Sequence, residues 1–144
     1  MIEQDTIKLL RECDSGVKMG ISSIEDVLKY VHSDKMQNCL LECKSEHEKL
    51  NNEMQQILFK YKDEGKEPNP IAKGMSWLKT NMKLAMKESD RVVADLITDG
   101  CNMGVKSLNK YLNQYKAADE ESKNITKRLI RLEEGLARDM QGYL

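Results

Sequence analysis

GVKMGISSI at residues 16–24 returns later in the chain as GCNMGVKSL at residues 100–108. Glycine, methionine, glycine and serine recur in place, and the aliphatic positions are exchanged like for like. The segment HEKLNNEMQQIL at residues 47–58 then returns as EEGLARDMQGYL at residues 133–144. Because both matches keep the same order, the repeated unit is a pair of segments. The chain is therefore predicted to contain two structurally equivalent halves.

The composition is that of a helical domain without a membrane-spanning segment. The chain has 144 residues, 33% of them charged and two of them proline, which suffices for one domain with a buried core. The interspersed charges sum to −1, whereas a nucleic-acid-binding module normally carries a basic face. No stretch is apolar enough to insert into a membrane and residues 1–15 show no signal-peptide pattern, so we expect a cytoplasmic protein.

Apolar residues recur at spacings of three and four in four segments, 10–31, 36–61, 97–115 and 125–143. This periodicity is typical of amphipathic helices. Ser33-Asp34 is predicted to form the turn between the first two helices and to provide the N-cap of the second helix. The third and fourth helices are joined through Lys116–Lys123.

The connection lengths predict the topology. Short connections make antiparallel hairpins of residues 1–62 and 91–144, and residues 63–90 form a long crossover between them. Within the crossover, residues 71–86 are predicted to form a shorter helix that opens at Asn69-Pro70. We therefore expect one all-α domain over residues 1–144, a four-helix bundle with a single crossover and an internal pseudo-twofold duplication.

Two glycine pairs, Gly16/Gly20 and Gly100/Gly104, lie in the interiors of the first and third helices. Glycine within a helix costs about 1 kcal/mol relative to alanine, so each pair needs a compensating role. We expect close approach of the first and third helices at these positions. The alternative is that the glycines leave room for a ligand in the middle of the bundle.

The chain resembles the ferritin-like superfamily. Glu46-His47-Glu48-Lys49-Leu50 is similar to the second-helix motif of rubrerythrins, in which a histidine is followed by a short run ending in leucine. The crossover, with Asn69-Pro70, Gly74, Trp77 and Lys79, looks like the crossing helix of a rubrerythrin-related bacterial branch of the superfamily. The resemblance implies self-association and a di-metal site that takes a carboxylate from each of two helices and a Glu-x-x-His motif from each of the other two.

The ligand pattern of that site fails residue by residue. His47 stands at the histidine position of the second helix, but Lys44 stands at the preceding glutamate position. On the fourth helix the repeat places Glu133 at the histidine position and Ile130 at the glutamate position. The first and third helices offer glycine and aliphatic residues at this level. We therefore predict that the di-metal site has been lost.

Two kinds of site remain as hypotheses. His47 and Glu133 are predicted to approach each other inside the bundle, although Leu132 competes with Glu133 for the inward position. Under a metal-binding alternative, His47 and Glu133 hold Fe or Mn with assistance from Glu48 or Glu134. Cys39 and Cys43 lie one helical turn apart, with His47 one turn further, a spacing that could bind a soft metal. The four cysteines show no other metal-site spacing, and we expect them to be small buried hydrophobic residues.

These observations favour a non-enzymatic structural or interaction protein without a cofactor, forming a homodimer or a higher homo-oligomer. A divergent Fe or Mn protein of oxidase or storage type, and a spore-coat-like assembly protein, are the alternatives. Trp77, Leu78 and Met82 of the crossover are candidates for an apolar contact patch, unless they dock on the bundle itself.

Overall fold

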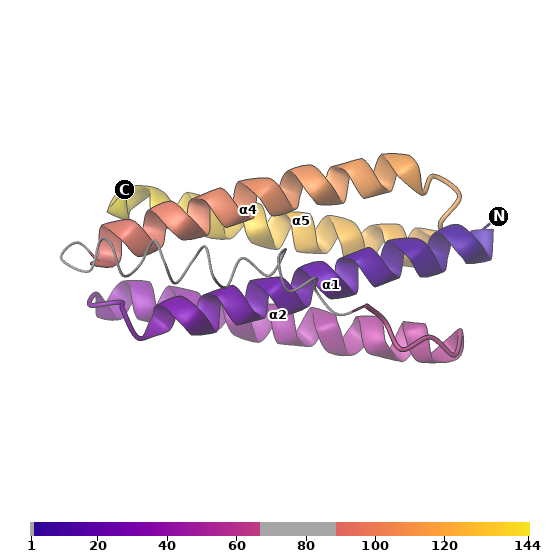
Figure 1. Ribbon diagram of the computed structural model, residues 1–144, viewed down its shortest axis with the longest axis horizontal. Coiled ribbons are helices and arrows are strands. Elements are labelled where there is room, and N and C mark those ends of the chain that lie inside the picture. Colours follow the sequence, from indigo (N-terminus) through magenta and orange to yellow (C-terminus); the bar gives the residue numbers. More distant parts are fainter. Residues whose placement is uncertain (1, 67–88) are drawn as a thin grey trace.

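The computed structural model describes residues 2–66 and 89–144, and this part of the chain is almost entirely helical (Figure 1). It contains no strand, so the all-α prediction is confirmed. The elements are α1 (Ile2–Leu28), α2 (Asp34–Lys60), α4 (Ser89–Gln114), α5 (Glu120–Met140) and a terminal 3-10 turn, η2 (Gln141–Tyr143). The predicted crossover helix at residues 71–86 and the Trp77, Leu78 and Met82 patch lie outside the described residues.

The helix starts are set by side-chain caps. Ser33 caps α2 as predicted, because its hydroxyl accepts a hydrogen bond of 3.2 Å from the amide of Met36. Asp119 caps α5 in the same way through the amide of Ser122 at 2.8 Å. Side-chain acceptors at these positions satisfy amides that the first helical turn leaves unpaired. The connection between α4 and α5 is therefore residues 115–119, shorter than the expected Lys116–Lys123.

The end of α1 also differs from the expectation. The helix stops at Leu28 instead of continuing to Val31. The amides of Tyr30 and Val31 bond to the carbonyls of Val27 and Leu28, at 2.9 and 3.2 Å. These shorter-range bonds tighten the chain into a turn, which ends the regular helix.

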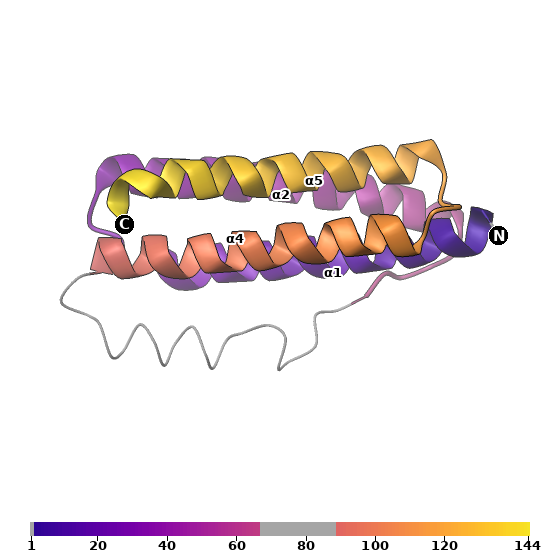
Figure 2. The same cartoon turned by 90° about the horizontal axis from the view of Figure 1, so that it is seen from above.

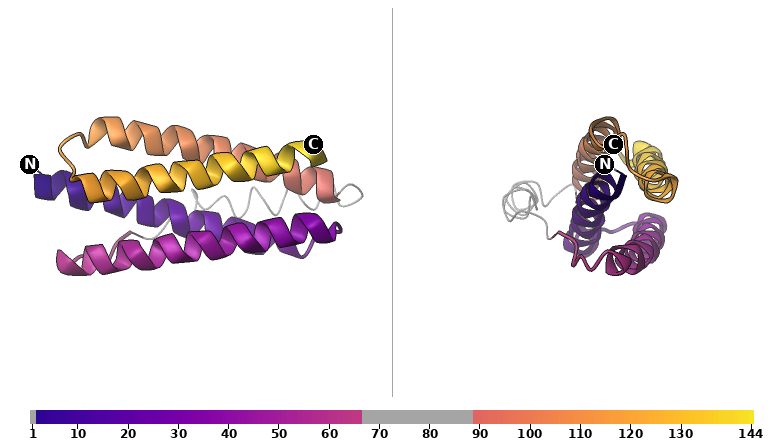
Figure 3. Two further views of the ribbon diagram at one scale, coloured as in Figure 1. Left: turned by 180° about the vertical axis from the view of Figure 1, so that it is seen from behind. Right: turned by 90° about the vertical axis from the view of Figure 1, so that its right-hand side faces the viewer.

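The helices form two antiparallel hairpins packed side by side. The first consists of α1 and α2 and the second of α4 and α5, with α5 packed on α2 and α4 packed on α1 (Figure 2). The end of α2 and the start of α4 lie at opposite ends of the bundle, as the views in Figure 3 show. Where the two hairpins pack together, α1 therefore runs in the opposite direction to α4, and α2 runs in the opposite direction to α5.

Two apolar clusters, one towards each end of the bundle, form the core. Each cluster contains residues from all four helices. One includes Ile24, Leu40, Ile97 and Met140, and the other includes Val17, Met54, Leu108 and Leu129. Between the clusters lies one position on each helix that is not occupied by an apolar side chain. We call these four residues the central layer: Gly20, His47, Gly104 and Glu133.

Carboxylates on the helices fasten the connections at both ends of the bundle. Asp90 at the start of α4 accepts hydrogen bonds from the amides of His32 and Ser33, at 2.6 and 3.1 Å. At the other end, Asp5 of α1 accepts a hydrogen bond of 3.0 Å from the amide of Ala117. These contacts fix the two hairpins relative to each other from outside the core. No helix in the described ranges has the length and apolarity needed to cross a bilayer.

Candidate functional site

His47 lies in the middle of the apolar stripe of α2. The buried positions Met36, Leu40, Cys43, His47, Leu50, Met54 and Ile57 alternate at spacings of four and three residues. The imidazole therefore points into the bundle, and the residue is 1% exposed to solvent. Its Nδ1 lies 2.8 Å from the carbonyl oxygen of Cys43 one turn earlier. This contact requires a proton on Nδ1 and leaves Nε2 to face the centre of the bundle.

Glu133 approaches His47 from α5. Its residue is 8% exposed, and its Oε1 lies 3.9 Å from Nε2 of His47. The structure thus brings these two predicted residues together inside the bundle, while Leu132 is half-buried and packs against both apolar clusters. The second carboxylate oxygen, Oε2, is buried and has no hydrogen-bond partner among the described residues.

Glycines on α1 and α4 make room for this pair. A Cβ on Gly20 would lie 2.8 Å from both Nε2 and Cδ2 of His47. A Cβ on Gly104 would overlap Oε2 of Glu133 and lie 3.0 Å from its Cδ atom. The two glycines therefore accommodate polar side chains from α2 and α5. The close approach of the first and third helix backbones at these glycines stays a prediction.

The other glycine of each pair has a looser environment. A Cβ on Gly16 would meet Leu129 at 4.0 Å, an ordinary contact, and a Cβ on Gly100 would meet no atom of residues 2–66 or 89–144 within 4 Å. The expected close helix packing is therefore not found at these two positions. The space left by Gly20 and Gly104 is filled by side chains of the protein itself, which argues against a ligand-sized opening there.

Burial and mutual attraction set the protonation of the pair. Burial alone lowers the pKa of His47, but its contacts with Cys43 and Glu133 outweigh this effect and raise the pKa from 6.5 to about 10. Burial raises the pKa of the Glu133 carboxyl, and His47 opposes that shift. Since a buried net charge is costly, the pair is most stable with one titratable proton, either as imidazolium and carboxylate or as imidazole and carboxylic acid.

Two buried thiols border the central layer. Cys43 Sγ lies 3.6 Å from Nδ1 of His47, and burial and the nearby Glu133 raise the pKa of the Cys101 thiol. Cys13 is also buried, as expected, whereas Cys39 is only half-buried and donates to Asp139 at 3.4 Å. Burial raises the pKa of Cys39 to about 12, which opposes formation of the thiolate that binds metals and attacks electrophiles.

The remaining predicted ligands do not join the pair. Glu48 and Glu134 are exposed on the surface. Glu46 is also exposed and pairs with Lys49 at 3.2 Å. The residue at the expected glutamate position on α2, Lys44, forms an ion pair of 3.3 Å with Glu25 of α1.

The donor set of the central layer does not fit a ferritin-like di-metal site. Such a site needs carboxylates from all four helices and two imidazoles, but the layer supplies one imidazole and one carboxylate, with thiols beside them. In the ranges 2–66 and 89–144, no three or more His, Cys, Asp or Glu residues are grouped so that they could hold a metal ion. We therefore derive no chemistry through a metal at this position.

A second buried carboxylate, Asp14 of α1, was not predicted as a site residue. Its Oδ1 accepts from the side-chain amides of Asn51 and Gln55, at 2.9 and 2.6 Å. Its Oδ2 accepts from the amide of Lys66 at 3.0 Å and pairs with the ammonium of Lys18 at 2.9 Å. Asp14 thereby fastens the end of the first hairpin to α1. The sequence signal was a carboxylate on the buried stripe of α1, next to Cys13.

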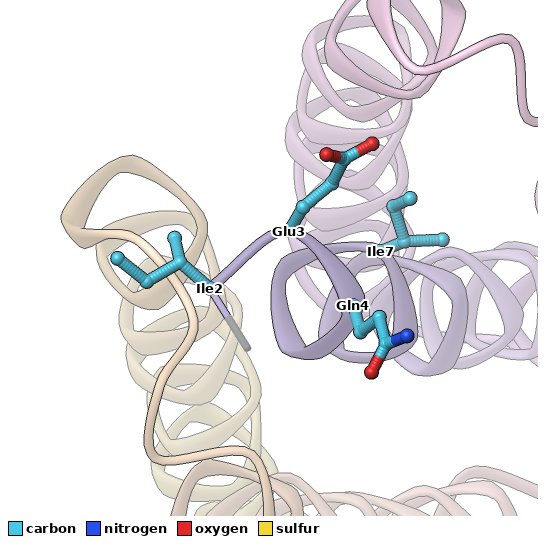
Figure 4. Close-up of a pocket in the computed structure, with 4 residues that line it drawn as sticks. All are labelled: Ile2, Glu3, Gln4 and Ile7. Atoms are coloured by element: carbon cyan, nitrogen blue, oxygen red, sulfur yellow. The ribbon is translucent and has the colours of Figure 1, made fainter.

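Two surface hollows lie away from the central layer. One is lined by Ile2, Glu3, Gln4 and Ile7 in the first turns of α1, whose side chains point in different directions (Figure 4). The other lies beside Cys39 and Asp139. Neither combines an apolar cavity with converging polar groups, which is the usual form of a small-molecule site.

Comparison of the chain with family models, with curated proteins and with solved structures found no match.

Proposed function

We propose that this chain is a non-enzymatic helical bundle of the ferritin-like type, which acts as a structural or interaction protein and has lost the di-metal site of that superfamily. The observation that supports this proposal is the central layer, because His47, Glu133 and two glycines lie between the two apolar clusters. A ferritin-like metal site would occupy this level of the bundle.

The helix directions support the ferritin-like assignment. The first hairpin ends and the second begins at opposite ends of the bundle (Figure 1). Ferritin-like bundles with one crossover have this arrangement of two antiparallel hairpins. The repeat supports the proposed duplication. Gly20 and Gly104 correspond in the repeated segments, as do His47 and Glu133, and each glycine packs against the polar residue of its own hairpin.

Elemental analysis of the purified protein tests the loss of the metal site. Protein produced in medium supplemented with iron and manganese, and then dialysed, is expected to retain neither metal. Iron or manganese retained near one ion per chain would overturn the proposal and support the divergent metal-protein alternative. The double variant His47→Leu/Glu133→Leu then shows whether such an ion sits in the central layer, because its loss in that variant assigns it there.

Light scattering over a range of protein concentrations tests the interaction role. The resemblance to the superfamily favours a homodimer or a higher homo-oligomer, and the four free cysteines fit a cytoplasmic location. A very large assembly would instead support the spore-coat-like alternative. A monomer at every concentration would contradict self-association.

A further inference from the structure

Polar contacts at three levels join α2 of the first hairpin to α5 of the second in the described part of the chain. They are Cys39 with Asp139 at 3.4 Å, His47 with Glu133 at 3.9 Å, and Glu53 with Arg128 at 2.8 Å. Both members of the middle contact are buried, whereas the outer two contacts reach solvent. The His47–Glu133 pair is thus the polar link inside the interface between the hairpins.

In this link a single ring nitrogen of His47, Nε2, lies 3.9 Å from the carboxylate of Glu133. Nδ1 of His47 is committed to the carbonyl of Cys43 at 2.8 Å, so only Nε2 can exchange a proton with the carboxylate. With that proton present, the pair is neutral as a whole. Without it, a carboxylate anion faces a neutral Nε2 that can only accept, and Oε2 has no partner among the described residues. An unpaired buried anion is strongly destabilising.

Among the described residues, His47 is the one group whose charge acts on the Glu133 carboxylate. From α1 the layer receives Gly20, and from α4 it receives Gly104 and the thiol of Cys101. From α2 it receives the thiol of Cys43 beside the imidazole. Lys44, next in sequence to Cys43, is already paired with Glu25 at 3.3 Å and reaches solvent.

We propose that the one titratable proton of the buried His47–Glu133 pair controls the docking of the two hairpins, so that the bundle loosens at this interface when the proton is lost. The inference concerns regulation of the fold and does not depend on the interaction role proposed above.

The direction of the pH dependence follows from the two protonation states. In the unfolded chain a histidine loses its proton near pH 6.5, whereas in the folded bundle the pKa of His47 is raised to about 10. Between these values the folded state holds one proton that the unfolded state does not. Stability from the pair is therefore fully present below about pH 6.5 and is lost as the pH rises towards 10.

Urea unfolding of the full chain at several pH values between 7 and 9.5 tests the proposal. The unmodified protein is expected to release one proton on unfolding. Its unfolding equilibrium constant should therefore rise with pH about tenfold more per pH unit than that of Glu133→Gln. In that variant no carboxylate compensates an imidazolium, burial favours the neutral ring, and the pair contributes no such slope. Taking the difference between the two proteins removes the contribution of the tyrosines and cysteines. Parallel pH profiles would overturn the proposal.

Asp14→Asn provides the matched control, since it neutralises another buried carboxylate of the bundle. This variant is expected to keep the pH slope of the unmodified protein even where its stability is lower. Loss of the slope in Asp14→Asn would show that the dependence is not specific to the central layer and would contradict the proposal.

A direct measurement keeps the proposal testable where Glu133→Gln does not fold. The ring nitrogens of His47 can be followed by ¹⁵N NMR of the unmodified protein as the pH is raised. The expected result is that Nε2 or its partner oxygen retains the proton above pH 9, while amide exchange in the middle turns of α2 and α5 accelerates as the proton leaves. An imidazole that titrates near pH 6.5, or exchange rates that follow only the intrinsic pH dependence, would refute it.

Discussion

The two glycine pairs of α1 and α4 allow a test in which the same substitution has opposite outcomes. Replacing glycine by alanine within a helix stabilises it by about 0.5–1 kcal/mol when the new methyl group meets no obstacle. Gly16 and Gly100 have open or ordinary surroundings, so Gly16→Ala and Gly100→Ala are expected to gain this amount. The two variants report the helix propensity alone.

In the central layer the same methyl group has no space. At Gly20 it would lie 2.8 Å from two atoms of the rigid His47 ring, and at Gly104 it would overlap the Glu133 carboxylate. Overpacking of a filled core costs about 1–3 kcal/mol. After the gain in propensity, Gly20→Ala and Gly104→Ala are each expected to lose about 1–2 kcal/mol of unfolding free energy.

Urea unfolding followed by far-ultraviolet circular dichroism measures all four variants under one condition. The expected difference between the central and the peripheral substitutions is about 1.5–3 kcal/mol. Four variants that change stability in the same direction would refute the reasoning. In that case the side chains of His47 and Glu133 do not fill the space beside Gly20 and Gly104.

Three further predictions concern the polar contacts. Gly65→Ala should lower the unfolding free energy by about 1–3 kcal/mol in urea titrations. Gly65 has φ +87, and the added Cβ would overlap the Asp14 carboxylate. An unchanged midpoint would contradict this. Asp14→Ala should cost about 3–5 kcal/mol and expose residues 62–66 to limited proteolysis, whereas an intact cleavage pattern would argue against the anchoring role. Glu133→Leu alone should cost about 1–3 kcal/mol, because it leaves the buried Nε2 of His47 without a partner. Combining it with His47→Leu should recover most of the loss, and additive losses in calorimetry would show that the two residues do not form a pair.

The sequence contained most of the information about the helices, because apolar spacing reports the face that each helix buries. It also placed His47 on the buried stripe of α2, since the histidine continues a regular alternation of apolar residues. The choice between Leu132 and Glu133 could not be made in this way, because adjacent residues both fall within the width of an inward face. The structure resolves it through Gly104, whose missing side chain gives the carboxylate its space.

Other features depend on contacts that local patterns do not encode. Asp14 bonds to residues 37 to 52 positions away in the chain, so its role follows from the packing of α2 and the next connection against α1. The repeat pairs Leu144 with Leu58, but Leu58 is fully buried and Leu144 is 55% exposed. The two differ because α2 continues as an α-helix at Leu58, whereas the corresponding segment has turned into η2. Sequence identity in the repeat therefore overstates structural equivalence at the end of the chain.

We propose that the His47–Glu133 pair closes the middle of the bundle and leaves no site for a metal ion there. The most direct test is ¹⁵N NMR of the His47 ring with and without excess Zn²⁺, Fe²⁺ or Mn²⁺. The expected result is a protonated Nδ1 whose signal neither shifts with Zn²⁺ nor broadens with the paramagnetic ions. Stoichiometric shifting or broadening of that signal would contradict it.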